Sequence, residues 1–451
     1  MRNNASRDLT EGSIAKNIWY LALPMMVGNV LQDLFNIVDM IFVGKLGPAA
    51  IAAVSMSGIL LMLVMTVAIG ISTGTVALVA RHFGAKQQEQ AENVAIQAVF
   101  VGILSSVVLG VLGYLLAAPV LRLLGAGKDV VPLGTSYIQI TSVGAITIFL
   151  GISLNSALRG AGDAVTPMKI LVLSTVLNIG LDPLLIFGIW KFPRLGVAGS
   201  ALATVISRGV GLLLLLRVFL NGHSLLHLKW RRIRVDIKVI KRMIKIGVFG
   251  SLQMLIRNIS ALILIRIVAI YGTSAVAAYG IGMRLRMMVM MPGMGLANAS
   301  ATLVGQNLGA KQPKRAGKSA WLTTGFYEVF MVSVGVLFII FAKDLIRIFN
   351  TDPQVIQLGT TYLRFLAPTF VFMALSIVLG RAMNGAGDTF SPMNITAVSF
   401  LGFRLPLAYV FAQVLKLATT GIWAGIAVSN VVQGSAMAWW FKKGKWKSNQ
   451  F

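Results

Sequence analysis

The chain has no cysteine and only three histidines among its 451 residues. Without cysteine there are no disulfides, no thiolate metal sites and no thiol nucleophile. His82, His223 and His227 all lie in polar, basic contexts, which speaks against a buried histidine metal site or triad. We therefore expect a protein that is not an enzyme and that has no resident cofactor.

Charged residues are also scarce, at 12% of the chain, against about a quarter in a typical soluble domain. Hydrophobic residues make up 57%, and the mean hydropathy is +0.81. This amount of charge is too small for a protein of this length to be soluble in water. Most of the surface of this chain must therefore face lipid. The sequence predicts an all-α integral membrane protein, multi-pass, in the cell (inner or plasma) membrane.

Twelve apolar segments are long enough to cross a bilayer, for which about 20 residues suffice. They are residues 16–45, 51–80, 91–118, 132–158, 164–190, 196–220, 243–270, 274–303, 317–342, 355–382, 391–415 and 420–441. Most exceed the minimum length, so tilted or protruding helices are expected.

The net charge is +26, which in a soluble protein would suggest nucleic acid. The largest basic cluster lies between two apolar segments, at 229–245, and another lies at 442–447. This is the pattern of cytoplasmic loops under the positive-inside rule and of contact with anionic lipid head groups. We predict that both termini are cytoplasmic, that membrane lipids are partners and that nucleic acid is not.

An internal repeat is the most informative feature of the chain. A shift of 225 residues aligns it with itself almost without gaps, and the Gly-Ala-Gly-Asp at 160–163 falls on that at 385–388. Each half has six apolar segments, so both halves enter the membrane from the same side. The predicted domains are a six-helix lobe at 1–220, a basic cytoplasmic linker at 221–242, and a six-helix lobe with a basic tail at 243–451. Two pseudo-symmetric lobes are typical of alternating-access transporters, and a complete pair in one chain should function as a monomer.

A carboxylate at the centre of a membrane costs about 2.5–3.5 kcal/mol, so each one is a functional candidate. Four of the 14 acidic residues lie well inside predicted segments, away from the segment ends: Asp33, Asp39, Asp182 and Glu328. The first segment also carries Asn29, Gln32 and Asn36, which share with its two acids an arc of about 120°. Such a stripe faces protein or a water-filled cavity; the alternative is a hydrogen-bond seam between helices.

The fifth segment carries Asn178 and Asp182 on one face, and Pro183 should bend the helix there. Freed carbonyls beside a carboxylate suit a cation or a proton, although a satisfied buried aspartate at a kink is the alternative. Further oxygen atoms come from Asn155, Tyr137 and Thr204, and hard monovalent cations prefer such ligands. We predict ion coupling at Asp39, Asp182, Asn178 and Asn155, with the first three as a possible Na⁺ site.

The second half does not repeat these residues. Under the 225-residue shift Asp39 becomes Leu264, Asp182 becomes Leu407 and Gln32 becomes Arg257. Coupling is therefore expected in the N-terminal lobe alone. Glu328 either pairs with Arg257 or Arg266 or takes part in transport.

A run of methionines in the eighth segment, which includes Met287 and Met291, would suit an adaptable substrate cavity; ordinary packing is the alternative.

With the repeat and these acids in place, the sequence resembles the multidrug and toxic compound extrusion (MATE) family, in its DinF-like prokaryotic branch. The resemblance covers nearly the whole chain. It is most specific at Pro24 with Gln32, Asn36 and Asp39, and at the Leu-Asn-Ile-Gly-Leu-Asp-Pro run of 177–183. It implies a twelve-helix bundle of two lobes and antiport of organic, often cationic, compounds against protons or sodium.

The resemblance also implies roles for single residues. Asp39 and Asp182 match the essential N-lobe acids, with Asn178 and Asn155 as polar neighbours. The surrounding positions are matched by Gln32, Tyr137 and Thr204, and Pro24 matches a first-helix proline whose bending is linked to protonation. The family's other main branch has acids in its C-terminal lobe, and their lack here argues against a sodium site in that lobe.

The predicted function is secondary active antiport that exports cationic or amphipathic drugs or metabolites, with H⁺ or Na⁺ as the coupling ion. The alternative is a flippase or exporter of lipid-linked or polar metabolites. A strongly cationic cavity would favour that alternative, and Arg257 and Arg266 are consistent with it.

Overall fold

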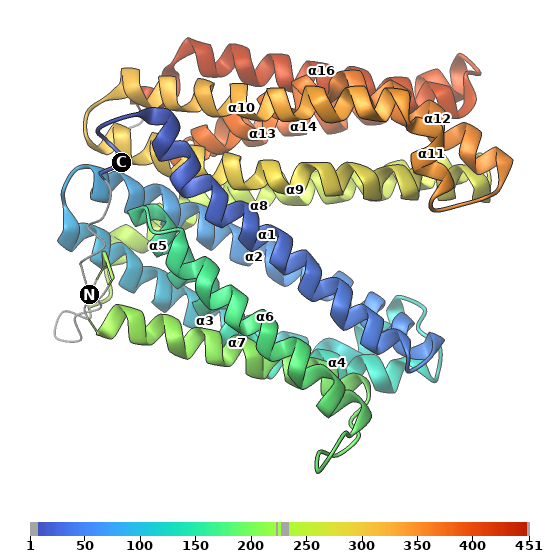
Figure 1. Cartoon of the computed structure of the whole chain (residues 1–451), viewed down its shortest axis with the longest axis horizontal. Coiled ribbons are helices and arrows are strands. Elements are labelled where there is room, and N and C mark those ends of the chain that lie inside the picture. The colour runs from blue at the N-terminus through green and yellow to red at the C-terminus, as the bar shows by residue number, and fades with distance from the viewer. Residues whose placement is uncertain (1–7, 222–223, 227–233, 449–451) are drawn as a thin grey trace. The chain divides into compact units, whose positions relative to one another are not determined.

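The computed structural model describes residues 8–221, 224–226 and 234–448, and within these ranges the secondary structure is helical, without a strand (Figure 1). Ten helical segments are each long and apolar enough to cross a membrane, and the bent pair α4 (Val130–Val143) and α5 (Ala145–Ala161) adds an eleventh. The expectation of an all-helical, multi-pass protein is confirmed. Of the predicted basic linker, 222–223 and 227–233 lie outside the described residues, and so do His223 and His227.

The described chain divides into two compact units. Unit 1 contains Val27–Gly247, and unit 2 contains Asp8–Met26 and Val248–Phe451. The division falls inside α1 (Ile14–Gly44) and α8 (Ile237–Ala269), whereas the predicted lobe limits at 220 and 243 follow the sequence repeat.

Unit 1 is built from long helices joined by short turns. They are α2 (Pro48–Gly84), α3 (Gln88–Leu123), α4, α5, α6 (Val165–Phe187) and α7 (Val197–Leu220), together with most of α1. The predicted fourth segment is two helices, α4 and α5, which meet at a 47° bend at Gly144. A Cβ on Gly144 would overlap the side chain of Val205 in α7, so only glycine lets α7 pack against the bend.

Unit 2 has the same order of segments with more interruptions. Its helices are α9 (Thr273–Gly309), α10 (Pro313–Ile340), α11 (Ala342–Arg347), α12 (Pro353–Leu366), α13 (Phe370–Gly385), α14 (Phe390–Ala397), α15 (Leu405–Tyr409) and α16 (Ala418–Lys443), together with most of α8. A 3₁₀ turn, η2 (Ala367–Thr369), joins α12 to α13, and the π-helical stretches η3 (Val398–Arg404) and η4 (Val410–Val414) flank α15. The predicted tenth and eleventh segments are therefore each continuous but irregular spans.

The predicted twelfth segment corresponds to α16, which has 26 residues and so a length of about 39 Å. It is not one of the ten helices whose length and hydropathy suffice for crossing a membrane. Ser429, Asn430 and Gln433 lower its hydropathy, and all three are buried within unit 2. The helix is therefore polar on the side that faces the rest of unit 2. With α16 included, each half of the sequence has six of the twelve segments.

The two units repeat the same local geometry, which confirms the internal repeat. Both α2 and α9 have 37 residues, and each follows a glycine with positive φ, at 107° in Gly47 and 94° in Gly272. Each ends before a lysine in the left-handed region, at 60° in Lys86 and 58° in Lys311.

The repeated Gly-Ala-Gly-Asp is a tight turn in both copies. The first glycine lies at a helix crossing, because a Cβ there would collide with Val79 of α2 in one copy and with the carbonyl oxygen of Ala301 in α9 in the other. The second glycine has φ of 99° or 86°. The aspartate then accepts hydrogen bonds from backbone N–H groups of the helix that follows, at 2.9–3.1 Å in 160–163 and 3.1 Å in 385–388.

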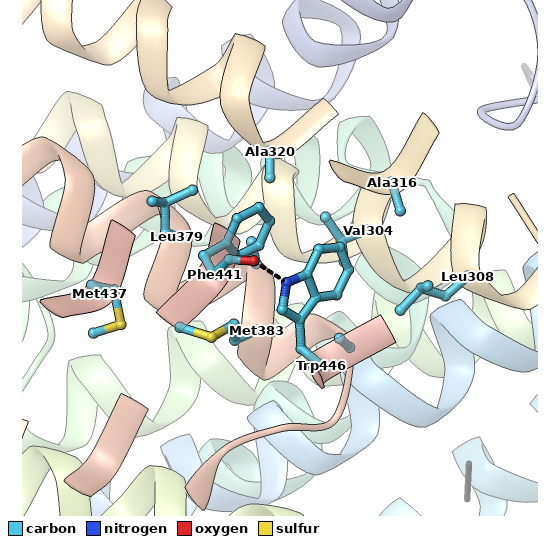
Figure 2. Close-up of a cluster of buried hydrophobic side chains, with 11 residues drawn as sticks. Val304, Leu308, Ala316, Ala320, Leu379, Met383, Met437, Phe441 and Trp446 are labelled. Carbon is cyan, nitrogen blue, oxygen red and sulfur yellow. Dashed lines mark hydrogen bonds between the residues drawn. The ribbon is translucent and has the colours of Figure 1, made fainter. Parts of the chain in front are cut away.

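A buried apolar cluster in unit 2 joins α9, α10, α13, α16 and the residues after α16 (Figure 2). Trp446 is fully buried and stacks on Phe441 with ring centroids 4.5 Å apart. Its indole Nε1–H donates to the carbonyl oxygen of Phe441 at 2.8 Å (Figure 2). Gly444, with φ of 74°, permits the reversal that brings the tail back onto the bundle.

Candidate functional site

Two carboxylates from different helices are buried in unit 1. Asp39 of α1 has 8% of its surface exposed and accepts a hydrogen bond from the Ser200 hydroxyl of α7 at 2.5 Å. Asp182 of α6 is fully buried and lies within electrostatic range of Asp39. The side-chain amide of Asn178, one turn earlier in α6, donates to Asp182 Oδ1 at 3.3 Å. The structure thus brings together three residues that the sequence predicted as a group.

Several buried oxygen atoms in this region have no hydrogen-bond partner among the described residues. They are Asp182 Oδ2, Asn178 Oδ1, Thr175 Oγ1 and Asn155 Oδ1. The first three recur along one face of α6, and the fourth comes from α5. Buried polar atoms are normally satisfied, so these oxygens suit a proton, a cation or water.

Tyr137 and Arg208 complete the group. Tyr137 of α4 is nearly fully buried and interacts electrostatically with Asp39, Asp182 and Arg208. Arg208 of α7 in turn interacts with Asp39, and its guanidinium lies 5.9 Å from the ring centroid of Phe35. Sequence reasoning missed Arg208. Its signal is its position two turns after Ser200 in an apolar helix, which puts both on one face with the buried Thr204.

Unit 1 contains a cavity of about 400 Å³, a size that accommodates a small organic molecule. Gln32 and Asn36 of α1, Asn155 of α5, Thr175 of α6 and Arg208 of α7 are on its wall. Most of the remaining lining is apolar. Arg208 therefore touches the cavity and interacts with Asp39, whereas Thr175 starts the row of oxygens that leads to Asp182.

The other predicted site residues lie elsewhere. Pro24 lies in the part of α1 that belongs to unit 2, and Met287 and Met291 lie on α9 in unit 2. Met287 is 52% exposed. The unit 1 cavity is lined by none of these three residues.

The two other acids of the predicted segments, Glu328 and Asp33, form no ion pair within the described ranges. Among the described residues no ion pair joins Glu328 to Arg257 or Arg266, and Arg266 is exposed. Asp33 is half-buried on α1, nearly two turns before Asp39.

A resident multivalent metal has no matching ligand set in the described ranges, where no three His, Cys, Asp or Glu side chains gather. A monovalent cation in transit would be held by the two carboxylates and the amide and hydroxyl oxygens named above, which are of the type that hard cations prefer.

The family model described as MatE matches residues 24–184 and 251–410, one stretch in each half of the chain. The chain belongs to the MatE family. MATE proteins are transporters, so this chain is a membrane transporter and not an enzyme. Curated relatives include the probable multidrug resistance protein YoeA of Bacillus subtilis (strain 168), 30% identical over 97% of this chain and 95% of that protein.

Two further relatives of this MATE transporter carry different names. The probable multidrug resistance protein NorM of Thermotoga maritima is 29% identical over 96% of this chain and 93% of that protein. A protein of Shewanella oneidensis named FAD transporter is also 29% identical, over 95% and 94% of the two chains.

Solved MATE structures match the fold over nearly its whole length. A MATE crystal structure in the bent conformation has a TM-score of 0.92 and 26% identity, and covers 98% of each chain. A MOP-superfamily transporter of Pyrococcus furiosus has a TM-score of 0.91 and 25% identity over all of both chains. For that protein a reverse polarity of the binding pocket is described as suggesting a different function. These relatives have twelve transmembrane helices in two lobes, which agrees with the twelve segments found here.

Proposed function

We propose that this MATE transporter is a secondary active antiporter that exports organic compounds in exchange for protons or sodium ions. Asp39 and Asp182 would be the coupling groups. The observation that carries the proposal is the pair of buried carboxylates in unit 1, one of which has an oxygen without a hydrogen-bond partner among the described residues. A buried carboxylate with an unpartnered oxygen is stabilised strongly when it binds a proton or a cation, because few neighbouring groups compensate its charge.

Arg208 would link the ion to the substrate. A charged Asp39 attracts the Arg208 guanidinium, and a protonated or cation-bound Asp39 does not. Because Arg208 also lines the cavity, ion binding changes the charge that the cavity presents. If the coupling ion and the substrate favour different positions of Arg208, both shift the same conformational equilibrium. Antiport requires such a coupling of the two binding events.

The expected substrates are organic compounds that are cationic or amphipathic, and the names of YoeA and NorM support multidrug export. No bound cofactor is needed beyond the coupling ion. The basic segments at 234–245 and 442–447 support an inner-membrane setting with both termini cytoplasmic and with anionic lipids as neighbours. A chain with both lobes would function as a monomer, without a nucleic-acid partner.

Export of anionic or lipid-linked polar metabolites is the second candidate. The observation that favours it is a group of arginines in unit 2 that interact electrostatically with each other. The relatives named FAD transporter and described with a pocket of reverse polarity support the same candidate.

The test is transport of a lipophilic fluorescent cation in proteoliposomes with an imposed proton or sodium gradient, for wild type and Asp39→Asn. We expect gradient-driven transport in wild type and its loss in the variant. Asp33→Asn is the matched control, because this carboxylate lies on the same helix outside the paired group, and it should keep transport. Transport that survives Asp39→Asn would contradict the coupling site. Absence of transport under either gradient would favour the second candidate.

A further inference from the structure

Four arginines from four segments of unit 2 form one cluster. Arg257 of α8 interacts electrostatically with Arg286 of α9 and Arg381 of α13, and Arg404 of η3 interacts with Arg257 and Arg286. Within the described ranges no ion pair joins any of the four to a carboxylate. Arg404 is buried, and the other three are half-buried. Like charges that are gathered in one place repel, so a cluster without acidic partners is unfavourable unless another anion compensates it.

Arg404 is held in place by neutral groups. Its Nε donates to the Ser429 hydroxyl at 2.9 Å, and an Nη atom donates to Asn430 Oδ1 at 2.8 Å. Its guanidinium lies 3.5 Å from the ring centroid of Phe400. These contacts fix the side chain, and none of them supplies a negative charge.

The neighbouring arginines have donors without acceptors. The Nε atoms of Arg257 and Arg286 are buried and have no hydrogen-bond partner among the described residues. An unpaired buried donor costs about 1–3 kcal/mol, and more when the group is charged. Such donors are rare in proteins and indicate a ligand or bound water.

Aromatic residues with further unpaired donors lie beside this cluster. Tyr362 interacts electrostatically with Arg286 and Arg404, and its ring centroid lies 4.8 Å from that of Trp423. Tyr279 stacks on Trp423 at 5.8 Å. The Tyr362 hydroxyl and Trp423 Nε1 have no hydrogen-bond partner in the part of the chain that the structure describes, and both side chains are 1% exposed. Arginine and indole N–H groups can only donate, so the two arginine Nε atoms and the indole Nε1 all require an acceptor. The Tyr362 hydroxyl, the fourth unpaired group, can also donate to an acceptor.

The repeat shows that corresponding positions have neighbours of opposite charge in the two units. Under the 225-residue shift Tyr362 corresponds to Tyr137, and Arg257 corresponds to Gln32. Tyr137 interacts with two carboxylates and one arginine, whereas Tyr362 interacts with arginines and a tyrosine. The same position of the fold thus faces acids in unit 1 and cations in unit 2.

We propose that the arginine cluster of unit 2 binds the phosphate or carboxylate group of an organic compound. The aromatic residues beside the cluster would pack against a ring of the same compound. The planar guanidinium donates two parallel hydrogen bonds to either anion, and aromatic faces pack against a flat organic body. This inference rests on the proposed transport function and narrows its substrates to amphipathic compounds that carry an anionic group, as in the second candidate; purely cationic compounds would not use this site.

The test is a fluorescence titration of the purified full chain in detergent with riboflavin and with riboflavin 5′-phosphate, two fluorophores that differ by one phosphate. Wild type should bind the phosphate ester at least about ten-fold more tightly, which corresponds to one charge-assisted hydrogen bond. Arg257→Gln and Arg286→Gln should each remove most of this preference. Arg286→Lys should restore part of it, because charge is kept and the planar fork is lost.

Arg266→Gln is the matched control, because this exposed arginine lies on α8 two to three turns after Arg257, and it should leave the preference unchanged. Nanodiscs with phosphatidylglycerol or with neutral lipid distinguish the source of the anion. Competition by the anionic lipid would assign the site to a lipid phosphate, and its absence would assign it to a water-soluble compound.

Equal affinity for the two flavins in wild type would overturn the proposal, and so would a preference that all arginine variants retain. If neither flavin binds, thermal stabilisation by inorganic pyrophosphate in wild type, lost in Arg286→Gln, would still support an anion site. No stabilisation would refute it. The titration uses no ion gradient, so its failure is distinguishable from a failure of coupling at Asp39.

Discussion

Removal of the hydroxyl that donates to Asp39 should change the pH dependence of transport. Ser200 Oγ lies 2.5 Å from Asp39 Oδ1, and both side chains are buried. A hydrogen bond to a charged group is worth about 1.5–3 kcal/mol, and it stabilises the carboxylate over the neutral acid. Ser200→Ala removes this bond and so favours the protonated form. At 1.36 kcal/mol for each pH unit, half-maximal coupled transport should move to higher pH by about 1–2 units.

The assay is the pH profile of substrate exchange in proteoliposomes, for wild type, Ser200→Ala and Ser207→Ala. Ser207 is the matched control because it is fully buried on the same helix, but its hydroxyl donates to the carbonyl oxygen of Ala203 at 2.7 Å. Its removal should leave the midpoint unchanged. An unchanged profile in Ser200→Ala, or equal shifts in both variants, would show that Asp39 is not the group whose protonation limits transport.

Two predictions concern stability, measured by thermal or denaturant unfolding in detergent. Gly385→Ala should destabilise by about 1–3 kcal/mol, because the added Cβ collides with the backbone of Ala301, whereas Gly280→Ala has open space and should not; equal effects would mean that the crossing of α13 and α9 is not tight. Trp446→Ala should cost about 3–5 kcal/mol through the loss of the cluster in Figure 2, and Trp439→Ala, which truncates a 56% exposed side chain, much less. A small loss for Trp446→Ala would show that the tail contributes little to the bundle.

The helical architecture was predictable because hydrophobicity and the repeat are properties of the sequence itself. The polar stripe of α1 and the Asn178–Asp182 pair follow from helical spacing within one segment. By contrast, the interruptions were missed. The bend at Gly144 depends on the fit of Val205 from another helix, and no pattern within 132–158 shows that contact.

The partners of the buried carboxylates were harder to predict, because they come from segments far apart in the sequence. Ser200 lies 161 positions from Asp39. The spacing of Ser200 and Arg208 places both on one face of α7, but it does not show that this face packs against Asp39. In unit 2 the sequence pointed to Arg257 together with Arg266. The structure leaves Arg266 exposed and groups Arg257 with arginines of three other segments instead.

The central claim is that the buried carboxylates of unit 1 couple an ion gradient to export. The most direct test measures the steady-state substrate ratio across proteoliposomes as a function of gradient size, for wild type and Asp182→Asn. The substitution preserves side-chain volume at a fully buried position, so the fold should be kept. For each ion exchanged per substrate, the wild-type ratio should rise up to about tenfold for each pH unit or each decade of sodium. In Asp182→Asn the ratio should stay near one at every gradient. A ratio that still follows the gradient in that variant would show that coupling does not require this carboxylate.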